Sequence, residues 1–201
     1  MPWVIGGNSE YFGSEKQEPN ALMVWEYYSA YGWTMNAVAG MLGNMQREST
    51  LNPALIEIGG TGHGLVQWTP PSDLYNVLDV IYGGHSDWEN PDKQCRVIYA
   101  EYEQKTGIHD WGIEPQWYPD TRGRYPAYGH WIMSWEEWAS STLPPADLAS
   151  AFMAEYERPG GLAEVERRNN ANRWYEFLSG HPPQPSSGNN RLKLWMYPHY
   201  F

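Results

Sequence analysis

The sequence predicts a mainly α-helical protein with a small β-hairpin or sheet, an α+β fold with one core. Val38, Met41, Leu42 and Met45 recur at the spacing of one apolar helix face. Between residues 51 and 69, a glycine-rich run separates two short apolar segments, which is typical of a hairpin. At 201 residues, the chain is long enough to bury one sizeable core.

Composition divides the chain into four parts. Residues 1–18 are polar and contain glycine, so we expect a loose N-terminal arm, followed by one domain over 19–180. Residues 181–190 have the Pro, Ser, Gly and Asn content of a linker. The aromatic segment 191–201 is too short to fold alone, so we expect it to pack on the domain or to dock on a partner.

Hydrophobic spacing, caps and breakers predict seven helices. Residues 107–133 show no period and are expected to form a long ordered loop, which in a compact domain is usually functional. The expected helices run from Asn20 to Trp33, Thr34 to Glu48, Ser72 or Asp73 to Tyr82, Asp87 or Asn90 to Lys105, Ser134 to Ser141, Pro145 to Tyr156 and Leu162 to Leu178.

Composition also excludes several classes of protein. The net charge is −11 without a Lys/Arg run, which argues against binding to nucleic acid. The chain has 12 Trp and 15 Tyr residues, more aromatics than a core needs, and these favour a groove that stacks flat ligands. We see no signal peptide and no membrane-spanning run, so we expect synthesis in a cytosol without stable membrane insertion. The single cysteine, Cys95, excludes an internal disulfide framework.

Glu48 is the strongest candidate for a catalytic residue. It follows Met41 by seven residues and Met45 by three, which places a carboxyl group on the apolar face in the last helical turn. Burial and the negative end of the helix dipole both favour the protonated carboxyl, the form that donates a proton near neutral pH. The ordinary alternative is a solvated helix end, or a partner of Arg47 or of a distant arginine.

Two further motifs fit a ligand cleft. In Gly62–Trp68, glycines allow close approach of the backbone, and Gln67 offers a donor and an acceptor beside the Trp68 ring. In Phe152–Gly160, Tyr156 and Glu157 lie at a helix end. Each motif alone is more simply a hairpin turn or a helix terminus with an aromatic residue in the core.

Together the three motifs resemble the lysozyme-like superfamily, including goose-type lysozymes and soluble lytic transglycosylases. The resemblance is closer to the phage tail lysozyme family. It is carried by Gly-Met-Leu-Gly-Asn-Met-Gln-Arg-Glu-Ser-Thr-Leu-Asn-Pro at Gly40–Pro53, Gly-Leu-Val-Gln-Trp-Thr-Pro at Gly64–Pro70 and Tyr-Glu-Arg-Pro at Tyr156–Pro159. The resemblance covers about residues 20–178 and implies that Glu48 cuts peptidoglycan glycan strands as a general acid.

The resemblance leaves the reaction open. It implies a muramidase that hydrolyses MurNAc-β-1,4-GlcNAc bonds, and Glu57, Asp73 and Glu157 are candidates for a second carboxylate. A lytic transglycosylase would use Glu48 alone. A tail-tip or wall-binding protein on the same fold would use no catalytic residue.

The resemblance also suggests how the substrate is held. Gln67 and Tyr156 are expected to hold the sugar and orient Glu48, with Ser49, Glu57 and Glu157 as further contacts. Stacking is expected from Trp68 and from aromatic residues of the long loop, namely Trp111, Trp117, Tyr118 and Tyr125.

We expect no cofactor and no metal. The six histidines, His63 among them, are isolated, which argues against a zinc peptidase. Cys95 has no nucleophile motif around it and is better explained as a buried structural residue than as the nucleophile of a cysteine peptidase. The expected partners are bacterial peptidoglycan and, through the C-terminal tail, phage tail-tip proteins. The expected location is the virion tail tip, or the host cytoplasm before release.

Overall fold

The computed structural model describes residues 2–118, 132–160 and 163–182 and is mainly helical, as the sequence predicts. The linker, the C-terminal tail and Tyr125 therefore lie outside the described residues, except for the first two positions of the linker. The helices are α1 Ser14–Ser29, α2 Met35–Ser49, α3 Ser72–Tyr82, α4 Pro91–Thr106, α5 Trp135–Ser140, α6 Pro145–Phe152, the π-helical turn η2 Met153–Glu157, and α7 Glu164–Ser179. None of these helices is long and apolar enough to cross a membrane.

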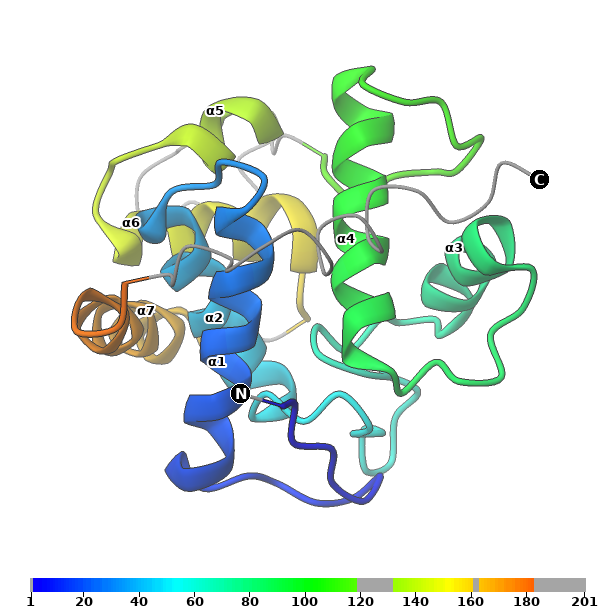
Figure 1. The fold of residues 1–201 in the computed structure, drawn as a ribbon, viewed down its shortest axis with the longest axis horizontal. Helices are drawn as coiled ribbons and strands as arrows, with labels where there is room; N and C mark the ends of the chain where they lie inside the picture. Colours follow the sequence, from blue (N-terminus) through cyan, green and yellow to red (C-terminus); the bar gives the residue numbers. More distant parts are fainter. Residues whose placement is uncertain (1, 119–131, 161–162, 183–201) are drawn as a thin grey trace.

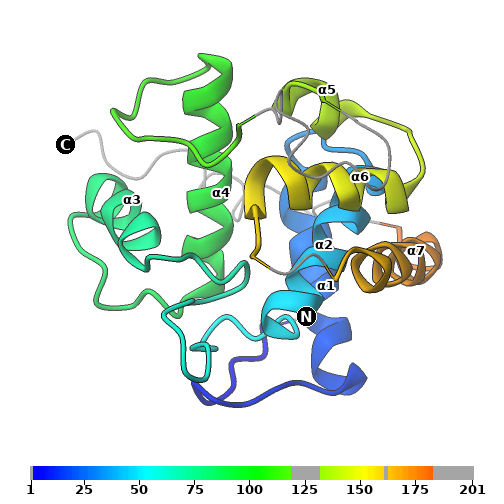
Figure 2. The same ribbon diagram turned by 180° about the vertical axis from the view of Figure 1, so that it is seen from behind.

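Helix α2 is the centre of the fold (Figures 1 and 2), with α6 and α7 on one side of it and α3 and α4 on the other. The Thr34 side chain caps its start by accepting a hydrogen bond from the Ala37 amide at 3.1 Å. Its predicted apolar face is fully buried. The helix stops at Thr50, which adopts the left-handed conformation with φ 52°, and Leu51 follows with φ 63°.

Two glycines of α2 let α6 and α7 approach closely. A Cβ atom on Gly40 would lie 3.0 Å from the Leu148 Cβ, and one on Gly43 would lie 2.5 Å from the Arg167 carbonyl oxygen. Such distances leave no room for a side chain, so the packing of α7 on α2 requires glycine at position 43. This contact determines which residues of α7 reach the end of α2.

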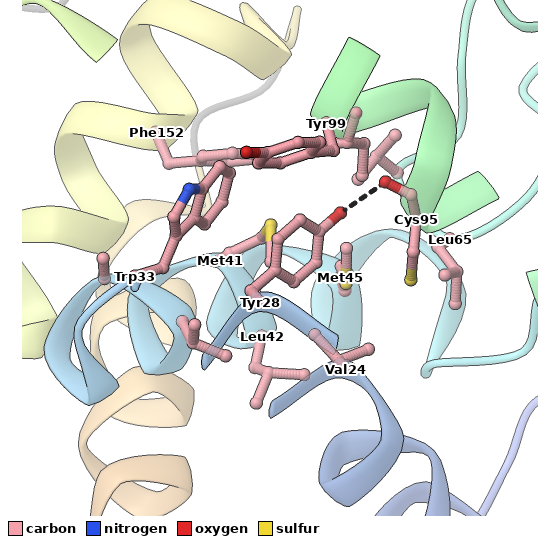
Figure 3. Packing of buried hydrophobic residues seen from close by; sticks show 14 of the residues in the cluster. Val24, Tyr28, Trp33, Met41, Leu42, Met45, Leu65, Cys95, Tyr99 and Phe152 are labelled. Atoms are coloured by element: carbon pink, nitrogen blue, oxygen red, sulfur yellow. Dashed lines mark hydrogen bonds between the residues drawn. The ribbon is translucent and has the colours of Figure 1, made fainter. Parts of the chain in front are cut away.

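The core is aromatic where α1, α2 and α4 meet (Figure 3). Tyr28 of α1 lies beside Met41 and Met45, and its hydroxyl donates to the Cys95 carbonyl of α4 at 3.1 Å. Cys95 is a free thiol with no exposed surface. These contacts join α4 to α1 and α2 and give Cys95 a packing role.

The small β-hairpin is not present in the described residues. The segment after α2 has two isolated bridges, Ile56 with His63 and His63 with Trp68. Gly64 and Gln67 take positive φ values of 78° and 51°, which turn the chain too tightly for a continuous ladder. The segment is held instead by the buried side chain of Gln94 in α4, which accepts from the Leu65 amide at 2.8 Å and donates to the Pro53 carbonyl at 2.7 Å.

The N-terminal residues differ from the expected loose arm. Helix α1 begins at Ser14, six residues before the predicted start, and contains Pro19. The Asn20 side chain accepts from the Val4 amide at 2.7 Å and donates to the Val4 carbonyl at 2.8 Å. The buried Asn20 side chain thus pairs with both the backbone N–H and the backbone C=O of Val4, as a neighbouring strand would. This pairing fixes the residues that precede the helix.

Candidate active site

A cleft of about 460 Å³ opens where the end of α2, residues 57–69 and the turn after η2 meet. It brings together six of the seven site residues that the sequence predicts, with Ser49 as the exception. The cleft is lined by Tyr11, Arg47, Glu48, Glu57, Val66, Gln67, Trp68, Thr69, Asp73, Gln116, Tyr156, Glu157, Arg158, Pro159 and Gly160.

Glu48 reaches the cleft from the last turn of α2, and its side chain is 20% exposed. It forms an ion pair with Arg167 of α7, whose own side chain is 2% exposed. Arg167 also donates to the Asn44 side-chain oxygen at 2.8 Å, one helical turn before Glu48. One buried guanidinium therefore holds two residues of α2 at fixed positions.

The ion pair changes the expected surroundings of Glu48. The sequence leaves open either a carboxyl group on the apolar face without a cation or one paired with a distant arginine, and the structure supplies that arginine. The pair nonetheless leaves part of Glu48 open to the cleft.

Glu157 is a second carboxyl group in the same cleft, at the end of η2. Burial raises its pKa well above the ordinary value, and the negative charge of Glu48 raises it further, against the opposing effect of Arg167 and Arg158. Its surroundings therefore favour the neutral form of Glu157.

Tyr156 lines the cleft and contacts a third carboxyl group, Glu101 of α4. The Tyr156 hydroxyl donates to Glu101 at 2.6 Å, and both residues are buried. Burial raises the pKa of Glu101 to about 8, although the Tyr156 hydrogen bond lowers it. The hydrogen bond fixes the tyrosine ring beside Phe152, at 4.7 Å between ring centroids.

Comparison with known proteins decides the family. The phage tail lysozyme family model matches residues 19–178, and therefore all three motifs. The chain belongs to the phage tail lysozyme family. Morphogenesis protein 1 of Bacillus phage B103 is 32% identical over 193 residues, which are 94% of this chain and 45% of that relative. The chain thus spans about half the length of the relative.

Gln67 and Trp68, in the second of the three motifs, both line the cleft. Trp68 is only 4% exposed, so little of its ring is open to the cleft. The Gln67 amide nitrogen donates to the Leu55 carbonyl at 3.1 Å and to the Gly64 carbonyl at 2.8 Å. Both amide hydrogens therefore hold the turn, and the side-chain oxygen is the group that remains for a ligand.

Ser49 lies behind the cleft. It has no exposed surface, and its hydroxyl is 2.8 Å from the Leu65 carbonyl and 3.1 Å from the Met45 carbonyl. The serine thus joins the end of α2 to the segment that carries Gln67. Its effect on a substrate is indirect, through the position of these residues.

The other two candidates for a second carboxylate also line the cleft. Glu57 is exposed and accepts from the Gly62 amide at 3.3 Å. Asp73 starts α3 and accepts from the Gln116 side chain at 3.3 Å, and burial raises its pKa, an effect that Arg158 opposes. No group of three or more His, Cys, Asp or Glu residues could hold a metal ion within the described ranges.

The aromatic residues predicted for stacking are mostly placed elsewhere. Trp117 has no exposed surface and stacks on Trp135 at 5.1 Å between ring centroids, which places it in the core. Trp111 donates its ring N–H to Glu103 at 3.0 Å. Tyr118 is 39% exposed and lies under Arg158 at 4.9 Å, but it does not line the cleft.

Sequence reasoning missed Arg167 and Glu101, although a signal for each is present. Glu101 follows Val97 by four residues and Ile98 by three, the same pattern that marks Glu48. Arg167 precedes Ala171 by four residues on the buried face of α7. In both cases, a charged residue on an apolar face marks the position.

Proposed function

We propose that this domain cleaves the glycan strands of peptidoglycan as a muramidase, with Glu48 as the general acid. The observation that carries the proposal is the placement of Glu48 in the cleft, held by Arg167, beside Gln67, Tyr156 and Glu157. Membership of the phage tail lysozyme family supports a wall-degrading role in a phage. The proposed location of the domain is the virion, at the tail tip.

Protonation of the glycosidic oxygen requires a carboxylic acid, and we assign this donor role to Glu48. Glu157 is a second carboxyl group in the same cleft, and its raised pKa favours its neutral form. We assign to Arg167 the role of a positioning residue that fixes the carboxyl group against the scissile bond.

A digest of purified peptidoglycan, read by mass spectrometry, tests the proposal. The wild type is expected to release fragments with reducing muramic acid ends. Glu48→Gln should cleave about 10²–10⁴-fold more slowly, because it removes the proton donor. Glu26→Gln changes an exposed glutamate of α1 that does not line the cleft, so it is the matched control and should cleave at the wild-type rate.

The products also separate the alternatives. Fragments that carry a 1,6-anhydro ring and lack one water would indicate a lytic transglycosylase that uses the same Glu48. Fragments with reducing glucosamine ends would show that the other glycosidic bond of the strand is cleaved. Binding without cleavage by wild type and Glu48→Gln alike would contradict the catalytic proposal and indicate a wall-binding tail component.

A further inference from the structure

The N-terminal segment, residues 2–13, forms part of the cleft although it precedes the family match at residue 19. It passes along the end of α2 and the chain that follows it (Figures 1 and 2). Buried Asn52 donates to the carbonyls of Gly7 at 2.9 Å and Glu10 at 2.8 Å. The Phe12 amide donates to the Thr50 hydroxyl at 2.7 Å, which fixes the segment next to Glu48.

Two adjacent aromatic residues of this segment face opposite ways. Phe12 is 4% exposed, whereas Tyr11 is 55% exposed and lines the cleft together with Arg47 and Glu48. Phe12 accounts for the anchoring, because burial of its ring stabilises the segment. The exposed ring of Tyr11 contributes little to that anchoring, and it places a flat apolar face beside the proposed catalytic residue.

The charges of the lining indicate which kind of ligand this face receives. Among the described residues, Glu48, Glu57 and Asp73 line the cleft with Arg47 and Arg158 as its cations, which disfavours a polyanion. A neutral sugar ring presents an apolar face to an aromatic residue and hydroxyl groups at its edge. Arg47, 46% exposed in its ion pair with Glu166 at 3.2 Å, has donors available for those hydroxyl groups.

We propose that Tyr11 forms a sugar-binding subsite in which its ring stacks on one pyranose of the glycan strand, with Arg47 at the edge of that sugar. The inference rests on the proposed function, because it assumes a glycan in the cleft. It assigns to a segment outside the family match a part in substrate binding. Tyr11 binds substrate and takes no part in proton transfer.

The test is the binding of soluble, uncrosslinked peptidoglycan glycan strands, measured by titration calorimetry in the Glu48→Gln background so that the ligand survives. Tyr11→Ala should raise Kd about tenfold, because the stacking face is lost. Tyr11→Phe should stay within about twofold, because it keeps the face. Tyr175→Ala removes an exposed tyrosine of α7 that does not line the cleft, and should match the parent.

The outcomes separate this inference from the proposed function. Equal Kd values for Tyr11→Ala and Tyr175→Ala would overturn the subsite, even if the wild type cleaves glycan. Weaker binding by Tyr11→Ala without any cleavage by the wild type would support the subsite and overturn the catalytic proposal. Absence of both binding and cleavage would overturn both. An unfolding temperature of Tyr11→Ala equal to that of the parent would exclude loss of fold as the cause of weaker binding.

Discussion

Glu48 lines the cleft and contacts the guanidinium of Arg167, whereas the fully buried Glu101 of α4 accepts a hydrogen bond from the Tyr156 hydroxyl. The second carboxyl oxygen of Glu101 is buried without a hydrogen-bond partner among the described residues. Glu48 thus has a cation as its partner, whereas Glu101 has a neutral hydrogen-bond donor. The difference teaches that burial alone does not decide whether a carboxyl group is charged, because a nearby cation also contributes.

Removal of Arg167 is expected to have the largest effect, because it takes away the cation that distinguishes Glu48 from Glu101. Arg167→Met leaves Glu48 without its cation and the Asn44 oxygen without its 2.8 Å donor, which should destabilise the fold by about 3 kcal/mol. Urea unfolding measures the change. Glycan cleavage should also fall, because Glu48 loses its fixed position.

Two controls sharpen this prediction. Arg47→Met removes an exposed ion pair on the same helix, with side chains 46% and 60% exposed, and should cost less than about 1 kcal/mol. The double variant Glu48→Gln/Arg167→Met should recover part of the lost stability, because no unpaired charge remains. Equal stability of Arg167→Met and Arg47→Met would contradict the buried ion pair.

A smaller effect is expected at Glu101, and it depends on pH. The pKa of this carboxyl is raised from 4.5 to about 8 in the folded state. The unfolded chain therefore releases its proton first as the pH rises, and stability present below about pH 4.5 is lost progressively up to about pH 8. The Glu101→Gln variant has no carboxyl group to titrate at this position. Its free energy of unfolding, relative to that of the wild type, should therefore be a few kcal/mol more favourable at pH 8 than at pH 5.

Thermal unfolding at the two pH values checks this expectation. Glu26→Gln, at an exposed position of α1, is the matched control and should change the unfolding temperature by the same amount at both pH values. A Glu101→Gln variant that follows the wild type at every pH would show that Glu101 is already charged in the folded protein.

The helices could be predicted because their signals are local. Thr34 caps α2 as expected, and Asn90 caps α4 by accepting from the Asp92 amide at 3.0 Å. The hairpin was not predictable in the same way, because the order of residues 51–69 depends on Gln94, which is far away in the chain. The N-terminal segment depends likewise on the distant side chain of Asn52.

The same distinction applies to the site. Glu48, Gln67 and Tyr156 could be proposed because each lies in a motif of its own. The ion pair joins residues 119 positions apart, and a sequence does not show that α7 packs on Gly43 closely enough to bring Arg167 there. Trp117 was misplaced because a high aromatic content fits a core as well as a groove.

The central claim is that Glu48 acts as the general acid in a cleft that also holds Glu157, and the pH dependence of glycan cleavage tests it most directly. Because the pKa of Glu157 is raised well above its ordinary value, wild-type cleavage should persist above the range in which an ordinary glutamate ionises, and fall on the alkaline side. Glu157→Gln should shift this fall to lower pH, because it removes the carboxyl group whose pKa is raised. An unchanged profile in Glu157→Gln, or cleavage that persists undiminished into strongly alkaline solution, would contradict the account.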